Sequence, residues 1–192
     1  MSLPLIVTAA GLSTRHPPNK LLLEVEGEPA LVTTLRRFVG KVDPLIVVLG
    51  KDAGRLLQIL SDRLPGQVTC VVNPDYARGL STSVRRGLDA LPASSSGVAF
   101  CNGDRPFLKD RTVNGWLERL ERDRDRIVFP VYRGIPGQPI YFPADLVPEL
   151  RRLRGDRGGR LVRDRHPERW QVWKVNDSGA VVDMDQALES SP

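Results

Sequence analysis

The chain has 192 residues, 41% of them hydrophobic and 27% charged, and we expect residues 1–192 to form a single globular domain. No apolar run is long enough to cross a membrane and no secretory signal stands at the N-terminus, so the cytoplasm is the expected location. The net charge of +5 comes from segments in which Arg alternates with Asp and Glu, without interleaved aromatic residues. This pattern is typical of solvated helix faces and argues against nucleic-acid binding.

Apolar runs typical of strands alternate with helical patterns over the first two thirds of the chain. Strands are predicted at 4–9, 45–49, 67–72, 97–101 and 126–131. Helices are predicted at about 29–39, 52–62, 80–91 and 109–122. The alternation predicts an α/β fold, a three-layer Rossmann-like arrangement with a mostly parallel sheet and helices on both faces.

Beyond residue 130 the pattern becomes irregular, with four Gly and Pro residues between 134 and 139. Short strands are predicted at 140–142, 170–175 and 180–182, and helices at about 143–153 and within 156–162. We expect these elements to extend the same sheet, because no linker of useful length divides the chain.

The cysteines and histidines do not predict a metal centre. Cys70 and Cys101 lie in apolar runs, which favours two buried thiols over a disulfide or a metal pair. His16 and His166 are too few and too far apart for a zinc site.

The segment from Thr8 to Lys20 follows the first predicted strand and begins with small residues. Small side chains allow backbone N–H groups to approach an anion, while Arg15 offers a planar fork for phosphate oxygens and Lys20 a point charge. The segment has neither the Rossmann glycine pattern nor a P-loop. A phosphate site and an ordinary turn with solvated cations are the two interpretations of this loop.

Carboxylates follow two predicted strands. Asp104 comes after an apolar strand through an Asn-Gly turn, at the sheet edge where ligands of open α/β folds bind. Asp183 and Asp185 are two residues apart at a predicted strand end, so they would project to the same side. Mg²⁺ prefers a few carboxylates together with phosphate oxygens and waters. We select Asp104 and Asp185 as the metal pair, with Asp183 as a third candidate, although Asp104 alone could be a turn or cap residue.

Gly79 precedes a predicted helix that contains Ser81 and Ser83. Serine at such a position commonly caps the helix, and it could instead contact a nucleotide. We expect one of the two hydroxyls to cap and the other to contact a ligand.

Six motifs, taken in order over residues 4–186, resemble nucleotidyltransferases of the molybdopterin branch, in particular the molybdenum cofactor cytidylyltransferase family. They are Ala9-Ala10-Gly11-x-Ser13-x-Arg15 with Lys20, Asn73 to Gly87, Gly103-Asp104-Arg105-Pro106, Pro130 to Pro139, Gly155-Asp156-x-Gly158, and Val182 to Asp185. The resemblance implies a nucleotide-diphospho-sugar transferase-like fold. It also implies transfer of CMP from CTP to a phosphorylated acceptor, molybdopterin or molybdenum cofactor, with Mg²⁺ and release of pyrophosphate.

The resemblance, together with the loop chemistry, assigns site residues. The expected nucleotide-binding residues are Ala9, Ala10, Gly11, Ser13, Arg15, Lys20, Asn73, Gly79, Ser81 and Ser83. Catalysis is assigned to Arg15, Lys20 and Asp104, and the metal to Asp104 and Asp185. The acceptor side is assigned to Arg133, Gly137 and Gln138.

Two positions depart from the family pattern: His16-Pro17 replaces Met-Gly, and Gln138 replaces a His. Proline removes a backbone N–H that could meet a phosphate. Three alternatives therefore stay open. One is GTP-dependent guanylyl transfer, one is cytidylyl transfer to a sugar or polyol phosphate, and one is a non-catalytic companion that binds the cofactor or a molybdenum hydroxylase.

Overall fold

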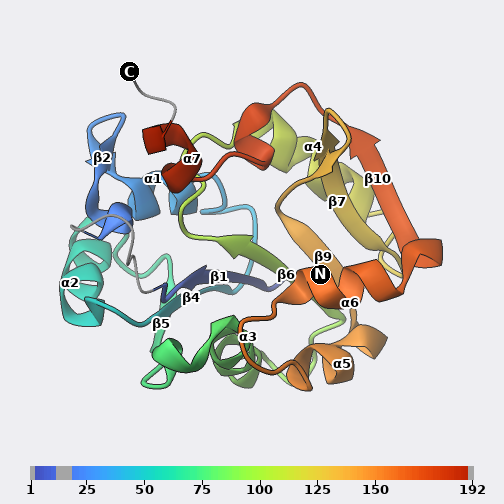
Figure 1. Ribbon diagram of the computed structural model, residues 1–192, viewed down its shortest axis with the longest axis horizontal. Coiled ribbons are helices and arrows are strands. Elements are labelled where there is room, and N and C mark those ends of the chain that lie inside the picture. Colours follow the sequence, from blue (N-terminus) through green and yellow to red (C-terminus); the bar gives the residue numbers. More distant parts are fainter. Residues whose placement is uncertain (1–2, 12–18, 190–192) are drawn as a thin grey trace.

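The computed structural model describes residues 3–11 and 19–189, and its centre is an eight-stranded mixed sheet (Figure 1). The strands of this sheet are β1 Leu5–Ala9, β4 Leu45–Leu49, β5 Thr69–Val72, β6 Gly97–Asn102, β7 Ile127–Tyr132, β8 Ile135–Pro136, β9 Ile140–Pro143 and β10 Trp170–Lys174. Their order is β10-β7-β9-β6-β1-β4-β5, with β8 paired to β7. The pairs β1–β4, β1–β6, β4–β5 and β7–β10 are parallel, whereas β9 runs antiparallel to β6 and β7.

Helices cover both faces of the sheet. They are α1 Ala30–Arg36, α2 Ala53–Arg63, α3 Leu80–Asp89, α4 Asp110–Leu120, α5 Val147–Arg151, α6 Gly159–Arg165 and α7 Met184–Glu189. Short 3-10 helices are interspersed among the described residues: η1 Lys20–Leu22, η2 Tyr76–Arg78, η3 Ala144–Leu146, η4 Pro167–Arg169 and η5 Ser178–Ala180. The predicted α/β class with a mostly parallel sheet is confirmed.

Alternation along β1 shows how the sheet separates two apolar layers. Leu5 and Val7 pack with residues of α1, α2 and α4, among them the fully buried Trp116. Ile6 faces the other side and packs with α3, α5 and α6 through residues such as Val84. Successive strand residues point to opposite faces, so a short apolar strand buried on both sides serves both layers.

The strand predicted at 180–182 is wrong, because η5 ends at Ala180 and α7 begins at Met184. Asp183 and Asp185 therefore do not share a strand end. The Asp183 carboxylate accepts from the Gln186 backbone N–H at 3.0 Å, and Gln186 Oε1 accepts from the Asp183 N–H at 3.1 Å. This reciprocal capping box starts a helix, and the two-residue spacing gave no sign of it.

Other boundaries differ for local reasons. The helix predicted over 143–153 is divided into η3 and α5, with Pro148 in the first turn of α5, where a missing N–H costs nothing. An unpredicted hairpin joins β2 Glu24–Val25 to β3 Glu28–Pro29. Its turn places Glu26 and Gly27 at φ values of 56° and 80°, the positive-φ pair of a tight hairpin turn.

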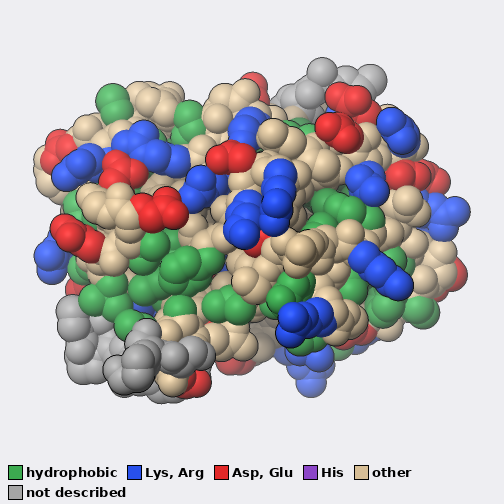
Figure 2. Space-filling model, turned by 90° about the horizontal axis from the view of Figure 1, so that it is seen from above, with side chains coloured by type: hydrophobic (Ala, Val, Ile, Leu, Met, Phe, Trp, Pro, Cys, Tyr) green, Lys and Arg blue, Asp and Glu red, His purple; other side chains and the backbone are tan. Residues whose placement is uncertain are grey.

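Of the two thiols expected to be buried, one is buried and the other is only partly so. Cys101 is buried, and burial raises the pKa of its thiol to about 12, whereas Cys70 is only half-buried on β5. On the face in Figure 2, Lys and Arg side chains lie among Asp and Glu side chains. Within residues 3–11 and 19–189, no helix has the length and apolarity needed to cross a membrane.

Candidate active site

A cavity of about 500 Å³ opens where β1 and β6 end. It is lined by Thr8, Ala9, Ala10, Gly11, Lys20, Leu21, Tyr76, Ala77, Arg78, Gly79, Leu80, Ser83, Asn102, Asp104 and Asp156. Seven of the residues predicted to bind nucleotide or metal are in this lining: Ala9, Ala10, Gly11, Lys20, Gly79, Ser83 and Asp104. Ligands of open α/β sheets bind outside the carboxyl ends of strands, and the cavity has that position.

Lys20 lies between the two carboxylates that were predicted to hold a metal. Its Nζ is 2.7 Å from Asp104 Oδ2 and 2.9 Å from Asp185 Oδ2. The three side chains are 16%, 12% and 11% exposed, respectively. We call these three residues the ion-pair cluster. The fold thus joins residues separated by 165 positions in sequence at one end of the cavity.

Burial and charge act in opposite directions on Lys20. Burial lowers the pKa of the Lys20 ammonium, but the Asp104 and Asp185 carboxylates outweigh burial, so that pKa is raised above its usual value. Lys20 is therefore cationic over the physiological pH range.

Asp104 retains an unused acceptor. Its Oδ2 meets Lys20, while its Oδ1 is buried and has no hydrogen-bond partner in the part of the chain that the structure describes. A buried carboxylate oxygen without a partner is costly, so it marks a position for a cation or donor supplied by a ligand.

Asp185 reaches the cluster from the first turn of α7. The Met184 N–H donates to the Asp104 carbonyl oxygen at 3.1 Å, which fixes the start of α7 beside the turn after β6. The sequence analysis expected Asp185 near Asp104 but placed it on a strand; in the structure both carboxylates contact Lys20, and Asp185 belongs to α7.

Asn73, predicted to bind nucleotide, organises the segment before α3 in the structure. Its Nδ2 donates to Thr82 Oγ1 at 2.9 Å and to Ser83 Oγ at 3.0 Å, and its Oδ1 accepts from the Asp75 N–H at 3.0 Å. Asn73 is 3% exposed and does not line the cavity. The hydrogen bond from Asn73 thus fixes the position of Ser83, which lines the cavity.

The serine of α3 expected to cap the helix does not do so. Gly79 is the N-cap of α3 and, as a glycine, has no side chain that could cap the helix. Ser81 is 1% exposed, and its Oγ has no hydrogen-bond partner among the described residues. Ser81 is outside the lining, so of the two hydroxyls only that of Ser83 belongs to a cavity-lining residue.

The start of α3 is fixed by the segment 155–158. The Ser81 N–H donates to the Gly155 carbonyl at 3.1 Å, and the Leu80 N–H donates to Asp156 Oδ1 at 3.2 Å. Gly79 has φ 109°, and a Cβ there would lie 2.5 Å from the Gly155 carbonyl carbon. Only glycine allows this approach of two backbones.

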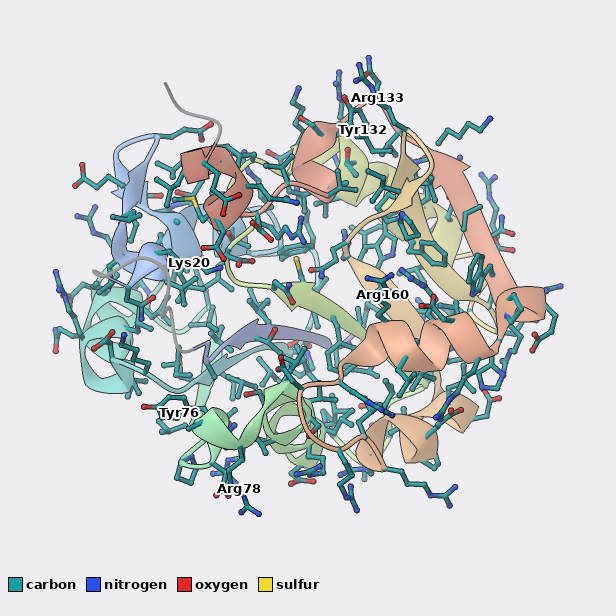
Figure 3. The ribbon with its side chains drawn as sticks, viewed as in Figure 1. Lys20, Tyr76, Arg78, Tyr132, Arg133 and Arg160 are labelled. Carbon is teal, nitrogen blue, oxygen red and sulfur yellow. The ribbon has the colours of Figure 1, made fainter. Side chains whose placement is uncertain are left out.

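The three residues assigned to the acceptor side lie outside the lining. Gln138 is the nearest to it, since its Oε1 accepts from the N–H of the lining residue Asn102 at 2.6 Å. A Cβ on Gly137 would meet the Ala180 carbonyl oxygen at 2.7 Å, so this glycine is required by packing. Figure 3 shows Arg133 and Tyr132 far from Lys20, and the Arg133 guanidinium lies 5.3 Å from the Tyr132 ring centre.

Four residues that carried sequence arguments lie outside the described residues: Ser13, Arg15, His16 and Pro17. Their assigned roles remain predictions. The neighbouring Gly11 is described, and a Cβ there would meet no atom within 4 Å, so packing within the described protein does not require glycine at this position.

The family model described as "MobA-like NTP transferase domain" matches residues 5–170. The chain belongs to this family. Molybdenum cofactor cytidylyltransferase from Escherichia coli is 33% identical to it over 136 residues, which cover 70% of this chain and 67% of that protein. The MobA-like chain also spans 24% of bifunctional GlmU from Rubrobacter xylanophilus, at 32% identity.

Solved structures have the same fold. The crystal structure of Rv0371c from Mycobacterium tuberculosis has a TM-score of 0.76 and 28% identity, with both chains covered completely. Its complex with manganese has a TM-score of 0.74 and 25% identity, again over both complete chains. The MobA-like chain is therefore a nucleotidyltransferase by family, with the nucleotide-diphospho-sugar transferase fold.

Sequence reasoning missed several cavity residues of this MobA-like chain. Tyr76 packs where Gly50 follows β4, since a Cβ on Gly50 would lie 2.6 Å from the Tyr76 ring. Asp156 belongs to a motif that was recognised but given no role. For Tyr76 the sequence offered one indication, because Gly50 directly follows a buried strand and leaves room for a large side chain. For Asp156 the neighbouring sequence gives no indication that it approaches α3.

Proposed function

We propose that this protein transfers CMP from CTP to a phosphate group of molybdopterin and releases pyrophosphate. The observation that carries the proposal is the ion-pair cluster at one end of a nucleotide-sized cavity whose walls include bare backbone at Gly11 and Gly79. The sequence similarity to molybdenum cofactor cytidylyltransferase supports the choice of CTP and of the acceptor.

The residues present fit a divalent cation. Asp104 Oδ1 is buried and unpartnered, and Asp185 Oδ2 meets the same Lys20 ammonium as Asp104 Oδ2. No group of three His, Cys, Asp or Glu side chains gathers at one point among the described residues, so other ligands would come from phosphate and water oxygens. This donor set suits Mg²⁺, which when bound to the two aspartates would neutralise phosphate charge.

The side chains then have separate tasks. An oxygen of the acceptor phosphate attacks the α-phosphorus of CTP, and the bond from that phosphorus to the bridging oxygen of pyrophosphate breaks. The attacking oxygen is already anionic, so no general base is required. Lys20 balances the negative charge that develops on pyrophosphate, and we assign the same role to Arg15. Gln138, beside Asn102, is the residue we assign nearest to the acceptor, with Gly137 and Arg133 farther from the cavity.

Nucleotide binding and turnover test the proposal together. Thermal unfolding with Mg²⁺ and each of CTP, GTP, ATP and UTP should show the largest stabilisation with CTP, because a ligand at 100 times its Kd stabilises by about 2.7 kcal/mol. Release of pyrophosphate should then require CTP and molybdopterin together.

Other outcomes identify the alternatives. Larger stabilisation by GTP, with pyrophosphate release, would assign guanylyl transfer. Tight CTP binding with release of pyrophosphate on a sugar or polyol phosphate, and none on molybdopterin, would assign a different acceptor. Tight binding without release on any acceptor would overturn the enzymatic proposal and indicate the non-catalytic companion of a molybdenum hydroxylase.

A further inference from the structure

The cavity has two chemically different ends. Lys20 and Asp104 lie at one end, while Tyr76, Gly79 and Leu80 lie at the start of α3 (Figure 3 labels Lys20 and Tyr76). Under the proposed function, on which this inference rests, the triphosphate occupies the end with the ammonium and the metal-binding carboxylates. The nucleoside must then extend toward the start of α3.

Asp156 is a second carboxylate of the lining, and its place at the nucleoside end needs an explanation. The acidic side chains among the described lining residues are Asp104 and Asp156. A carboxylate repels phosphate oxygens and accepts hydrogen bonds only from donors. A nucleoside carries such donors on the exocyclic amine of its base and on the ribose hydroxyls.

The orientation of Asp156 is fixed by α3. Oδ1 accepts from the Leu80 N–H at 3.2 Å, one of the donors that a helix start leaves without a partner inside the helix. In the part of the chain that the structure describes, Oδ2 accepts no hydrogen bond and forms no ion pair. One oxygen of Asp156 is therefore committed to the fold, while the other is available to a ligand.

The surrounding backbone keeps this arrangement in place. Gly79 and Gly155 approach so closely that a Cβ on Gly79 would lie 2.5 Å from the Gly155 carbonyl carbon. A Cβ on Gly158 would lie 2.7 Å from Leu80 Cδ2, so the segment on both sides of Asp156 is packed against α3. A carboxylate whose backbone is packed on both flanks and whose Oδ1 is hydrogen-bonded is directed toward one position, which allows it to discriminate between ligands.

We infer that Asp156 determines nucleotide specificity by accepting, through Oδ2, a hydrogen bond from the nucleoside half of the substrate. A cytosine amine and a ribose hydroxyl share this donor chemistry. UTP lacks the amine and 2′-deoxy-CTP lacks one hydroxyl, so these two nucleotides distinguish the donors.

The experiment measures Kd values of CTP, UTP and 2′-deoxy-CTP, each with Mg²⁺, for the wild type, Asp156→Asn and Asp75→Asn. In Asp156→Asn the Leu80 N–H still needs an acceptor, so the amide oxygen takes the place of Oδ1 and the amide NH₂ faces the ligand. A carboxylate acceptor thereby becomes a donor without loss of the helix cap. Asp75→Asn is the matched control, because Asp75 is a neighbouring exposed carboxylate that pairs with Arg78 and does not line the cavity.

We expect the wild type to prefer CTP over at least one of the two analogues by roughly tenfold or more, the usual effect of a hydrogen bond to a charged group. Asp156→Asn should abolish that preference. If the donor is the base amine, the variant should favour UTP, whose carbonyl at that position accepts from the new NH₂. Asp75→Asn should leave all ratios unchanged.

Two results overturn the inference. One is a wild type that binds all three nucleotides equally, and the other is an Asp156→Asn variant that keeps both wild-type ratios. Melting temperatures of the variants show whether the cap is intact, and Asp156→Glu provides a second variant if the Asn variant does not fold. CTP binding without transfer would contradict the proposed function and leave this test in force, whereas binding of no nucleotide would overturn both.

Discussion

The ion-pair cluster and the start of α3 occupy opposite ends of one cavity and are built in opposite ways. At the first, three charged side chains converge within 2.9 Å contacts and are each less than one fifth exposed. At the second, the wall includes Gly79, which packs closely against Gly155, and the exposed carboxylate of Asp156. Charge in a poorly solvated place is strong but unselective, whereas directed donors and acceptors discriminate between ligands. We therefore expect changes at the cluster to affect rate and the strength of triphosphate and metal binding, and changes at α3 to affect nucleotide choice.

The largest expected effect is that of Asp104→Asn. The change keeps the shape of the side chain and removes the charge that a hard cation requires. Pyrophosphate release from CTP and molybdopterin should fall by roughly a hundredfold or more, with an unchanged circular dichroism spectrum.

Asp183→Asn is the matched control for that prediction. Asp183 belongs to the same acidic segment as Asp185, but its carboxylate caps α7, and asparagine caps a helix equally well. Transfer at the wild-type rate is expected. A loss of transfer activity comparable to that of Asp104→Asn would instead place Asp183 among the metal-binding residues.

Lys20→Met should act in two directions. Loss of the ammonium removes a charged contact to the triphosphate, which weakens CTP binding by about 1.5–3 kcal/mol. The same ammonium competes with divalent cations for Asp104 and Asp185, so Mn²⁺ alone should bind the variant more tightly than the wild type. Calorimetric titrations with CTP and with MnCl₂ measure the two effects. Weaker Mn²⁺ binding by the variant would show that the two carboxylates do not form the cation site.

The contrast between the two ends also shows what the sequence could predict. Asp104 comes shortly after the buried strand β6, and Lys20 belongs to the sequence segment that follows β1, so the rule that ligands bind at carboxyl ends of strands located both. Asp185 was paired with Asp104 from the ligand preference of Mg²⁺, and the family resemblance implied the same pair. The capping box at Asp183 and Gln186 was missed, because the local hydrogen bonds of a short helix leave little hydrophobic pattern. Asp156 was beyond prediction, since its role depends on a contact with Leu80, which is 76 residues away in sequence.

Gly79→Ala tests the α3 end through its backbone. At φ 109° an L-residue is strained, and the new Cβ would lie 2.5 Å from the Gly155 carbonyl carbon. We expect a loss of about 1–3 kcal/mol in the free energy of unfolding, measured by urea denaturation, together with a reduced preference for CTP.

Gly115→Ala is the control for this change. Gly115 lies within α4, and a Cβ there would meet nothing within 4 Å. Alanine in a helix interior is favoured over glycine by about 0.5–1 kcal/mol, so this variant should be slightly more stable than the wild type. If Gly79→Ala proved equally harmless, the close approach of α3 and the segment 155–158 would not be needed for stability.

The smallest expected effect is at Glu149. This residue of α5 forms hydrogen bonds with residues at the end of α6. Its carboxylate accepts from Arg165 Nη1 at 2.7 Å and lies 2.8 Å from His166 Nε2. The hydrogen bond from Arg165, followed by that from His166, holds the pKa of Glu149 below its usual 4.5. A carboxyl whose pKa is lowered in the folded state stabilises the fold above its unfolded pKa, and this contribution is lost as pH falls through the folded pKa.

Glu149→Gln should therefore cost less than about 1 kcal/mol of unfolding free energy at pH 7, since the ion pair lies at the surface, with Arg165 53% and Glu149 24% exposed. The difference from the wild type should shrink as pH falls below 4.5 and the wild-type carboxyl is protonated. Urea denaturation at neutral and acidic pH measures both values. Because the partners of Glu149 are Arg165 and His166, whereas those of Lys20 are Asp104 and Asp185, we expect the Mn²⁺ affinity not to change. A difference that persists undiminished in acid would assign the effect to packing of α5 on α6 rather than to charge.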